Sequence, residues 1–180
     1  LHVESAIRRT KNDIEEQATK MMYCPDSKTC IWHLMDRLVD PTIEIVNDVT
    51  HKFEELFNEF PPVPLFDVNL FETLSKKYTL SVSCNTMFNS GRVLQKSITD
   101  LKLPFKFYLW SDQIGYYKPS PFFAQKILAE SSVTSYNEIL HVGDTKATDG
   151  QLCEFSGMEF IHTVRKNPNL NQLLSLNNGK

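Results

Sequence analysis

The sequence has no surplus of positive charge. It contains 19 lysine and arginine residues against 22 aspartate and glutamate residues, which gives a formal net charge of -3. Proteins that bind nucleic acid or an anionic membrane surface through long-range electrostatics usually carry a basic excess. The composition therefore predicts neither nucleic acid nor a membrane as a partner, and an anionic ligand has to be held by local contacts.

Cysteines and long apolar runs are also scarce. Four cysteines in 180 residues are too few for a disulfide scaffold, and they form no C-x-x-C pair. This usage favours a reducing compartment and hence a cytoplasmic protein. No apolar run approaches the roughly 20 residues of a membrane span, and nothing at the first residue indicates a signal peptide.

The remaining composition is that of an ordinary globular protein. Hydrophobic residues make up 41% of the chain and charged residues 23%, which excludes a disordered or collagen-like chain. The length fits one domain, or one domain with a modest insertion. The sequence contains no internal repeat.

A proline cluster at 61–64 divides the chain into two regions. Before it, apolar residues recur at helical spacing, with charged residues on the faces between them. Residues 1–60 are therefore predicted to form an all-helical domain. The apolar positions of the first predicted helix are Val3, Ile7, Ile14, Ala18 and Met21.

After the prolines, short apolar runs alternate with amphipathic helical stretches. Strands are predicted at 79–83, 105–110, 139–142 and 158–162. Such an alternation is typical of a parallel sheet with helices on both faces. The predicted fold class is thus α/β, a Rossmann-like domain over residues 61–180 that follows the helical one.

Three of these strands are followed by residues that suit phosphate or metal chemistry. Cys84 and Asn85 follow the first strand, and Lys118 lies between a glycine turn and a proline after the second. Asp144 and Asp149 follow the third strand, and paired carboxylates at a strand end suit Mg²⁺. Each feature alone is also compatible with ordinary turn chemistry, so the argument depends on their order and spacing together.

Three segments resemble the haloacid dehalogenase (HAD) superfamily of phosphatases and related hydrolases. They are residues 80–91 (LSVSCNTMFNSG), 110–123 (WSDQIGYYKPSPFF) and 140–157 (LHVGDTKATDGQLCEFSG). In that family the first supplies a hydroxyl residue and an asparagine near the phosphoryl group, the second a charge-stabilising lysine, and the third the Mg²⁺-binding acid. The resemblance assigns these roles to Cys84, Asn85, Lys118, Asp144 and Asp149.

The resemblance also implies an activity. Members of the family hydrolyse small phosphorylated substrates with Mg²⁺ through an aspartyl-phosphate intermediate. Residues 1–60 would then form the helical cap that closes over the site and recognises the leaving group. Residues 61–180 would form the HAD-like α/β core.

The sequence departs from the family pattern in two ways. Cys84 stands where the family usually has serine or threonine, and a thiol is a weaker hydrogen-bond donor than a hydroxyl. The first family motif, D-x-D-G-T, is absent from the 180 residues, so its nucleophilic aspartate is expected upstream of Leu1. Asp67, which begins a partial match to this motif, is interpreted as a helix cap.

Two other classes of protein stay open at this stage. One is a catalytically inactive HAD-like binding or scaffold module, which the absent first motif favours. The other is a zinc module that uses Cys24, Cys30 and His33, which offer only three ligands at irregular spacing. His141, in the third strand, is predicted to be a packed or half-exposed strand histidine.

The absent motif makes a prediction about the sheet. In the family its strand lies between the two strands that here end at Asn85 and at Asp144. The chain alone is therefore expected to form an incomplete sheet, to be filled by an upstream segment or by another chain. Direct pairing of the two flanking strands would favour the scaffold interpretation, and their separation would favour the hydrolase.

Overall fold

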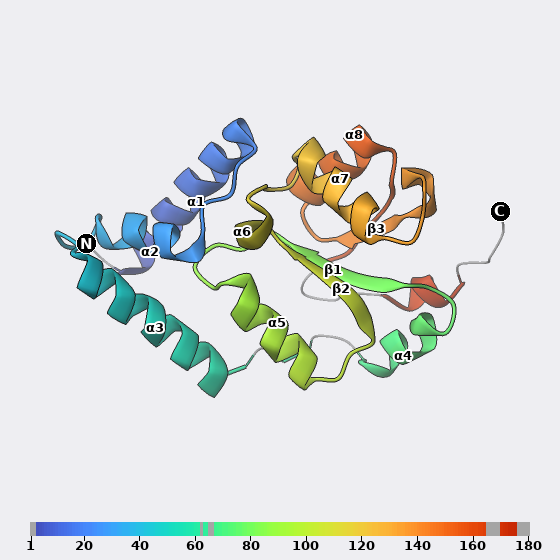
Figure 1. The fold of residues 1–180 in the computed structure, drawn as a ribbon, viewed down its shortest axis with the longest axis horizontal. Helices are drawn as coiled ribbons and strands as arrows, with labels where there is room; N and C mark the ends of the chain where they lie inside the picture. The colour runs from blue at the N-terminus through green and yellow to red at the C-terminus, as the bar shows by residue number, and fades with distance from the viewer. Residues whose placement is uncertain (1–2, 62, 65–66, 165–169, 176–180) are drawn as a thin grey trace.

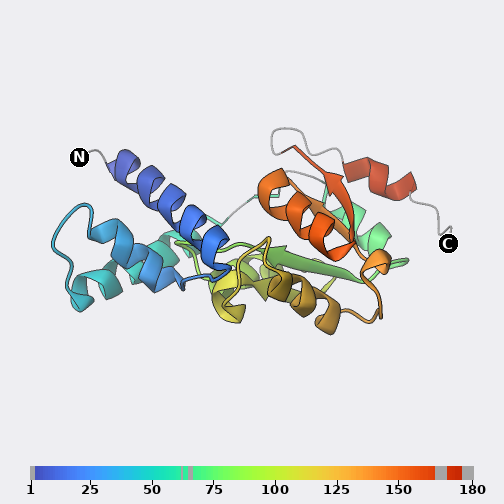
Figure 2. The same ribbon diagram turned by 90° about the horizontal axis from the view of Figure 1, so that it is seen from above.

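The computed structural model describes residues 3–61, 63–64, 67–164 and 170–175. The helical region and the region that contains the strands occupy opposite sides of the molecule (Figures 1 and 2). The proline cluster at 61–64 lies between these two regions in the sequence.

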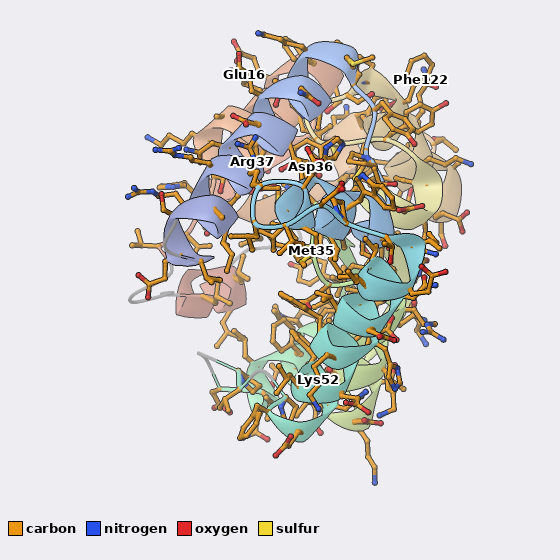
Figure 3. All side chains as sticks on the ribbon, turned by 90° about the vertical axis from the view of Figure 1, so that its left-hand side faces the viewer. Glu16, Met35, Asp36, Arg37, Lys52 and Phe122 are labelled. Carbon is orange, nitrogen blue, oxygen red and sulfur yellow. The ribbon has the colours of Figure 1, made fainter. Side chains whose placement is uncertain are left out.

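Three helices form the N-terminal region: α1 (Val3–Met21), α2 (Ser27–Met35) and α3 (Ile43–Glu59). The buried residues of α1 repeat every four positions, at Ala6, Thr10, Ile14 and Ala18. They form one stripe along the helix because residues four apart lie on the same face. Figure 3 looks onto these helices, and Arg37, just after α2, reaches back to pair with Asp13 of α1.

Side-chain caps begin two of these helices. The carboxylate of Asp26 accepts a hydrogen bond from the backbone N–H of Thr29 at 2.7 Å, which starts α2. The hydroxyl of Thr42 accepts one from the N–H of Ile45 and starts α3. These bonds satisfy N–H groups that the first turn of a helix leaves without partners.

Helices and strands alternate after residue 67. In chain order they are α4 (Asn69–Ser75), β1 (Leu80–Cys84), α5 (Gly91–Asp100), β2 (Phe105–Trp110), α6 (Ser111–Ile114), α7 (Pro121–Glu130), the short 3₁₀ turn η1 (Tyr136–Glu138), β3 (Leu140–Gly143), the π-helical turn η2 (Lys146–Gly150), α8 (Gln151–Ser156), β4 (Glu159–His162) and the 3₁₀ segment η3 (Leu170–Ser175). The four predicted strands are confirmed to within one residue at either end.

Helices cover both faces of the strands, as the sequence predicts. On one face, Leu109 of β2 packs with Phe123 of α7 and Leu152 of α8 in one core cluster. On the other face, Leu70 of α4 and Leu173 of η3 pack against strand residues, which include Leu80, Leu140, Val142 and Ile161. The strands therefore lie between two apolar layers, the usual environment of parallel strands.

The strands form two separate parallel pairs. β1 pairs with β2, β3 pairs with β4, and no described strand joins β1 to β3. No residue of β1 or β3 is fully buried, although inner strands of a parallel sheet normally are. The sheet is incomplete, as predicted, and of the two outcomes left open the structure shows β1 and β3 unpaired with each other. Each therefore has an edge that faces away from its partner strand.

Two local predictions can be compared with the structure. Gly157 ends α8 in the left-handed conformation at φ 86°, as a glycine at this position allows. Asp67 is not the residue at the cap position of α4, because that residue is Val68. The Asp67 carboxylate lies one position earlier and accepts a hydrogen bond from the backbone N–H of Asn69 at 2.9 Å.

Among the residues that the structure describes, every helix is too short or too polar to cross a membrane.

Candidate functional site

The candidate residues gather where β1 and β3 end. Parallel strands of one layer carry their carboxyl ends at the same edge, and side-chain contacts link the segments that leave them. Lys118 contacts both the end of β1 and Asp149, and Asp149 contacts the backbone of the residue after Asp144. Lys118, Asp144 and Asp149 are thus parts of one connected cluster.

Lys118 is the cation of this cluster, and it is buried. Its side chain is 7% exposed, and its Nζ donates to Asp149 Oδ1 at 2.7 Å and to the carbonyl of Ser83 at 3.0 Å. The ammonium also lies 5.8 Å from the centre of the Phe123 ring. A buried ammonium needs such partners because losing its hydration is costly.

Asn85 holds the backbone of Lys118. Its side-chain Nδ2 donates to the carbonyl of Lys118 at 3.1 Å, and its Oδ1 accepts from the N–H of Lys118 at 2.8 Å. Both ends of the amide are therefore used to fix the segment that carries the lysine. The contact of Asn85 with a phosphoryl group stays a prediction.

Asp149 sits at the centre of the cluster. Besides Lys118, its Oδ1 lies 3.0 Å from His141 Nε2, and its Oδ2 accepts from the N–H of Thr145 at 3.2 Å. Burial raises the pKa of this carboxyl, but the hydrogen bond to His141 and the charge of Lys118 outweigh burial. The net effect holds the pKa of Asp149 well below its ordinary value, so the group is an anion at neutral pH.

Gly143 makes room for the Asp149 carboxylate. A Cβ atom at this position would lie 2.4 Å from both Cγ and Oδ2 of Asp149. Any side chain here would displace the carboxylate, which explains why glycine follows the apolar residues of β3. The sequence signal for this close approach is the Gly-Asp pair at the strand end.

Asp144 follows Gly143 directly and is partly buried. The hydroxyl of Thr145 donates to its Oδ1 at 3.4 Å, and His162 Nε2 donates to its backbone carbonyl at 3.2 Å. The end of β4 therefore helps to fix the backbone of Asp144. Its carboxylate belongs to the same strand end as Asp149, and Thr145 bonds to both acids, to Asp144 through its hydroxyl and to Asp149 through its backbone N–H.

Asp144 and Asp149 are the two carboxylates of this strand end that could hold Mg²⁺. Mg²⁺ needs only one or two protein carboxylates and takes its other ligands from water or substrate. Oδ1 of Asp149 already accepts from Lys118 and His141, so this oxygen would have to give up a donor before it could bind the ion. No group of three or more His, Cys, Asp or Glu side chains that could hold a metal ion occurs among the described residues.

Cys84 and Ser83 end β1 beside the cluster. The thiol of Cys84 is partly buried and lies 3.4 Å from the carbonyl of Asn85, to which it donates. Ser83 enters the cluster through its backbone carbonyl, which accepts from Lys118. Whether Cys84 contacts a substrate oxygen stays a prediction.

A second polar network, next to the cluster around Asp149, joins the helical region to the end of β1. Cys24 Sγ lies 3.0 Å from Ser111 Oγ, and this hydroxyl accepts from the N–H of Thr86 at 2.7 Å. Thr86 in turn donates to Asp112 Oδ1 at 2.7 Å. The loop between α1 and α2 is thereby anchored next to Asn85.

The cysteines of the open zinc interpretation belong to this buried region. Burial raises the pKa of Cys24 to about 11 and that of Cys30 to about 12. Cys24, Cys30 and His33 do not come together as a group that could hold a metal ion among the described residues. Cys24 is a hydrogen-bonding core residue in this structure, and the geometry gives the zinc interpretation no support.

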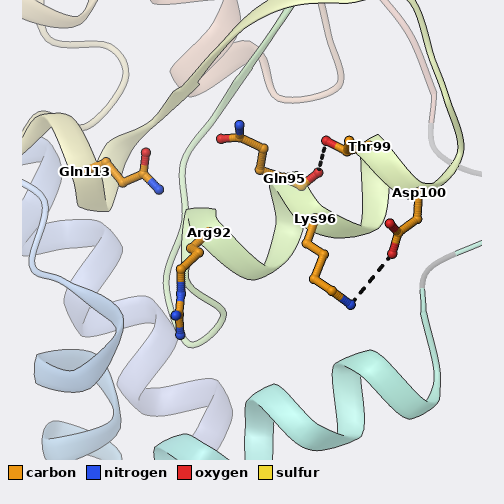
Figure 4. Close-up of a pocket in the computed structure, with 6 residues that line it drawn as sticks. All are labelled: Arg92, Gln95, Lys96, Thr99, Asp100 and Gln113. Atoms are coloured by element: carbon orange, nitrogen blue, oxygen red, sulfur yellow. Dashed lines mark hydrogen bonds and ion pairs between the residues drawn. The ribbon is translucent and has the colours of Figure 1, made fainter.

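A surface hollow of about 330 Å³ lies away from the cluster, on α5 (Figure 4). Six polar residues line it: Arg92, Gln95, Lys96, Thr99, Asp100 and Gln113. Its two cations are already paired, Arg92 with Glu54 and Lys96 with Asp100. Exposed ion pairs of this kind are only weakly held in one geometry. The buried cluster, whose charges are fixed, is therefore the better candidate for a functional site.

His141 is the residue of the cluster that the sequence argument missed. It packs in its strand as predicted, with a side chain that is 10% exposed, but its contact with the Asp149 carboxylate at 3.0 Å was not predicted. Residues 141 and 143 face the same side of a strand because side chains alternate. A histidine two positions before the Gly-Asp pair is the signal that could have revealed the contact.

Comparisons with solved structures identify the fold. The chain matches a 2-haloacid dehalogenase from Pseudomonas syringae pv. Tomato DC3000 over 90% of its own length and 67% of that protein, at 20% identity and a TM-score of 0.59. It matches a HAD phosphatase from Thermococcus onnurineus over 74% of this chain and 58% of that one, at 20% identity and a TM-score of 0.54.

A third match covers nearly all of both proteins. The magnesium-bound putative HAD-hydrolase YfnB from Bacillus subtilis aligns over 96% of this chain and 91% of its own, at 16% identity and a TM-score of 0.51. No protein-family model and no curated protein sequence matches the chain. The chain therefore shares the fold of these HAD proteins, and it spans 58% of the length of the Thermococcus phosphatase.

Proposed function

We propose that this chain is part of a Mg²⁺-dependent phosphohydrolase of the HAD type that acts on a small phosphorylated metabolite. The observation that carries the proposal is the buried pair of Lys118 and Asp149, held at 2.7 Å where β1 and β3 end. A buried ion pair is not needed for stability, because apolar residues of similar volume usually serve as well. A fixed cation at a strand end is, however, what the charge of a phosphoryl group requires.

Lys118 would stabilise that charge directly. Its bonds to Asp149 and Ser83 use two of the three N–H groups of the ammonium, and the third would bond to a phosphoryl oxygen. Asn85 would keep the lysine backbone in place through its two hydrogen bonds. Rigid placement matters because catalysis by fixed charges costs no reorganisation during the reaction.

Asp144 is the residue of this chain that would hold Mg²⁺. When bound there, the ion would neutralise charge on the phosphoryl oxygens. The nucleophilic aspartate, which would form the aspartyl-phosphate, and the aspartate that protonates the leaving group are proposed to lie upstream of Leu1. The strand that carries them would pair with the edges of β1 and β3, which are not paired with each other.

A catalytically inactive HAD-like scaffold is the second candidate. It is favoured by Cys84, whose thiol is a weaker donor than the hydroxyl usual in the family. It is also favoured by the absence of D-x-D-G-T from the 180 residues. The separation of β1 from β3 supports the hydrolase, because a collapsed scaffold would have closed this edge.

Hydrolysis of p-nitrophenyl phosphate by the complete protein, including any residues that precede Leu1, tests the proposal. We expect Mg²⁺-dependent release of p-nitrophenol that EDTA abolishes. Asp144→Asn and Lys118→Met should each lower kcat by at least about 100-fold, whereas the exposed control Asp100→Asn on α5 should keep it. Activity that survives Asp144→Asn with an unchanged metal requirement would contradict the assignment, and an inactive wild-type protein would favour the scaffold.

A further inference from the structure

We infer that His141 is a positioning residue of the phosphoryl site, which fixes the Asp149 carboxylate and through it the ammonium of Lys118. The role in phosphoryl transfer rests on the proposed function, whereas the contact itself belongs to the structure. His141 Nε2 lies 3.0 Å from Asp149 Oδ1, and the side chain is 10% exposed. No role follows for His141 from the family resemblance that assigns the other residues.

The hydrogen bond has one possible direction. A carboxylate that already accepts from the Lys118 ammonium can only accept again. Nε2 of His141 therefore carries a hydrogen and donates it to Asp149 Oδ1. Oδ1 thus receives two donors, one from β3 and one from the segment after β2.

The imidazole is itself held in place by its surroundings. Its ring stacks on Phe160 of β4, with ring centres 6.5 Å apart and planes 23° apart. Phe160 packs against the core cluster that contains α7 and α8. The orientation of His141 is therefore set by the packing of the apolar core.

Three donors then restrain the Asp149 carboxylate. His141 and Lys118 bond to Oδ1, the N–H of Thr145 bonds to Oδ2, and the missing side chain of Gly143 leaves room for the group. With its acceptor restrained, Lys118 keeps one position between Asp149 and the carbonyl of Ser83. A small displacement of a catalytic charge lowers the rate strongly, so the loss of the His141 bond is expected to affect kcat.

Two substitutions separate positioning from packing. His141→Gln keeps an N–H donor at the end of the side chain, whereas His141→Phe keeps the ring against Phe160 but removes the donor. The control is His51→Phe, at an exposed histidine of α3 that pairs only with Glu55 among the described residues. Thermal unfolding of each variant checks that the comparison is made between folded proteins.

We expect His141→Phe to lower kcat for p-nitrophenyl phosphate by about 10- to 100-fold with KM within about 3-fold of wild type. His141→Gln should restore kcat to within about 5-fold of wild type, although both variants unfold at similar temperatures. His51→Phe should change neither constant. Equal kcat values for the two His141 variants, or wild-type kcat in His141→Phe, would overturn the inference.

A spectroscopic measurement distinguishes failure of this inference from failure of the proposed function. Long-range ¹H–¹⁵N NMR should show a slowly exchanging proton on Nε2 of His141, assigned by its absence from His141→Gln. Without that signal the inference is wrong, whatever the activity. If the signal is present and the wild-type protein hydrolyses no phosphomonoester, the contact is supported and the proposed function fails.

Discussion

At the scale of single residues, the Asp149 carboxylate is the group that holds the candidate site together, because it accepts hydrogen bonds from a lysine, a histidine and a backbone N–H. Each partner comes from a different part of the chain: Lys118 follows β2, His141 lies in β3 and Thr145 begins the turn after it. Removal of one member of a buried ion pair is costly, since the other is left without compensation. Substitutions in the cluster should therefore lower the free energy of unfolding as well as the activity.

Asp149→Asn is expected to lower the free energy of unfolding by about 3 kcal/mol at pH 7, because Lys118 loses its anionic partner. The pKa of Asp149 is held below its ordinary value in the folded protein. The stability that this group contributes is fully present above the ordinary pKa of about 3.9 and is lost as the pH falls below it. Urea unfolding at pH values between 7 and 2.5 measures this dependence.

The difference between wild type and Asp149→Asn should shrink by at least about 1 kcal/mol towards the acid end of that range. Asp100→Asn, at an exposed acid of α5, serves as the control and should differ little from wild type throughout. A constant difference between Asp149→Asn and wild type would show that the low pKa is wrong.

At the scale of elements, helix α7 contacts the cluster through Phe123, whose ring lies against the Lys118 ammonium. It begins at Pro121 and is capped by Ser120, whose buried hydroxyl accepts from the N–H of Phe122 at 3.2 Å. The next residue, Phe123, is fully buried and lies under the Lys118 ammonium. The cap thus fixes the start of the helix two residues after the lysine.

Ser120→Ala should lower the free energy of unfolding by about 1 kcal/mol, because it removes the acceptor for the first turn of α7. Ser120→Gly should change the free energy of unfolding by only a few tenths of a kcal/mol relative to wild type, because glycine is tolerated at the cap position. Urea denaturation gives both values. Equal effects of the two substitutions would mean that the cap bond contributes nothing and that the site only tolerates small residues.

Most elements could be predicted from local patterns in the sequence. Of the apolar positions predicted for α1, Ile14 and Ala18 are buried, whereas Val3 and Met21, at its two ends, are exposed. The short apolar runs locate the strands, because burial imposes these periods. Contacts between distant residues have no local pattern. The hydrogen bonds of Asn85 to the backbone of Lys118 join residues 33 positions apart, so sequence spacing could not reveal them. The bond between His141 and Asp149 has a weaker signal, the histidine two positions before the Gly-Asp pair. The turn at 146–150 was also missed, since its π-helical hydrogen bonds leave no distinct period.

At the scale of the whole molecule, contacts of the α1–α2 loop and of α3 attach the helical region to the strand region. The loop after α1 is anchored through Cys24, whose thiol meets Ser111, and through the backbone of Cys24, which donates to the carbonyl of Gly115. Helix α3 lies beside α5 (Figure 1), where Glu54 pairs with Arg92. These contacts place α1 to α3 on the same side as the end of β1, the position that the proposed cap requires.

The central claim is that the ends of β1 and β3 form a phosphoryl site around Lys118. The most direct measurement is a titration of the complete protein with inorganic phosphate, followed by ¹H–¹⁵N NMR of backbone amides. We predict saturable shifts at Asn85, Lys118 and Thr145 that Lys118→Met abolishes. Shifts confined to the hollow on α5, or shifts at the strand ends that persist in Lys118→Met, would contradict the claim.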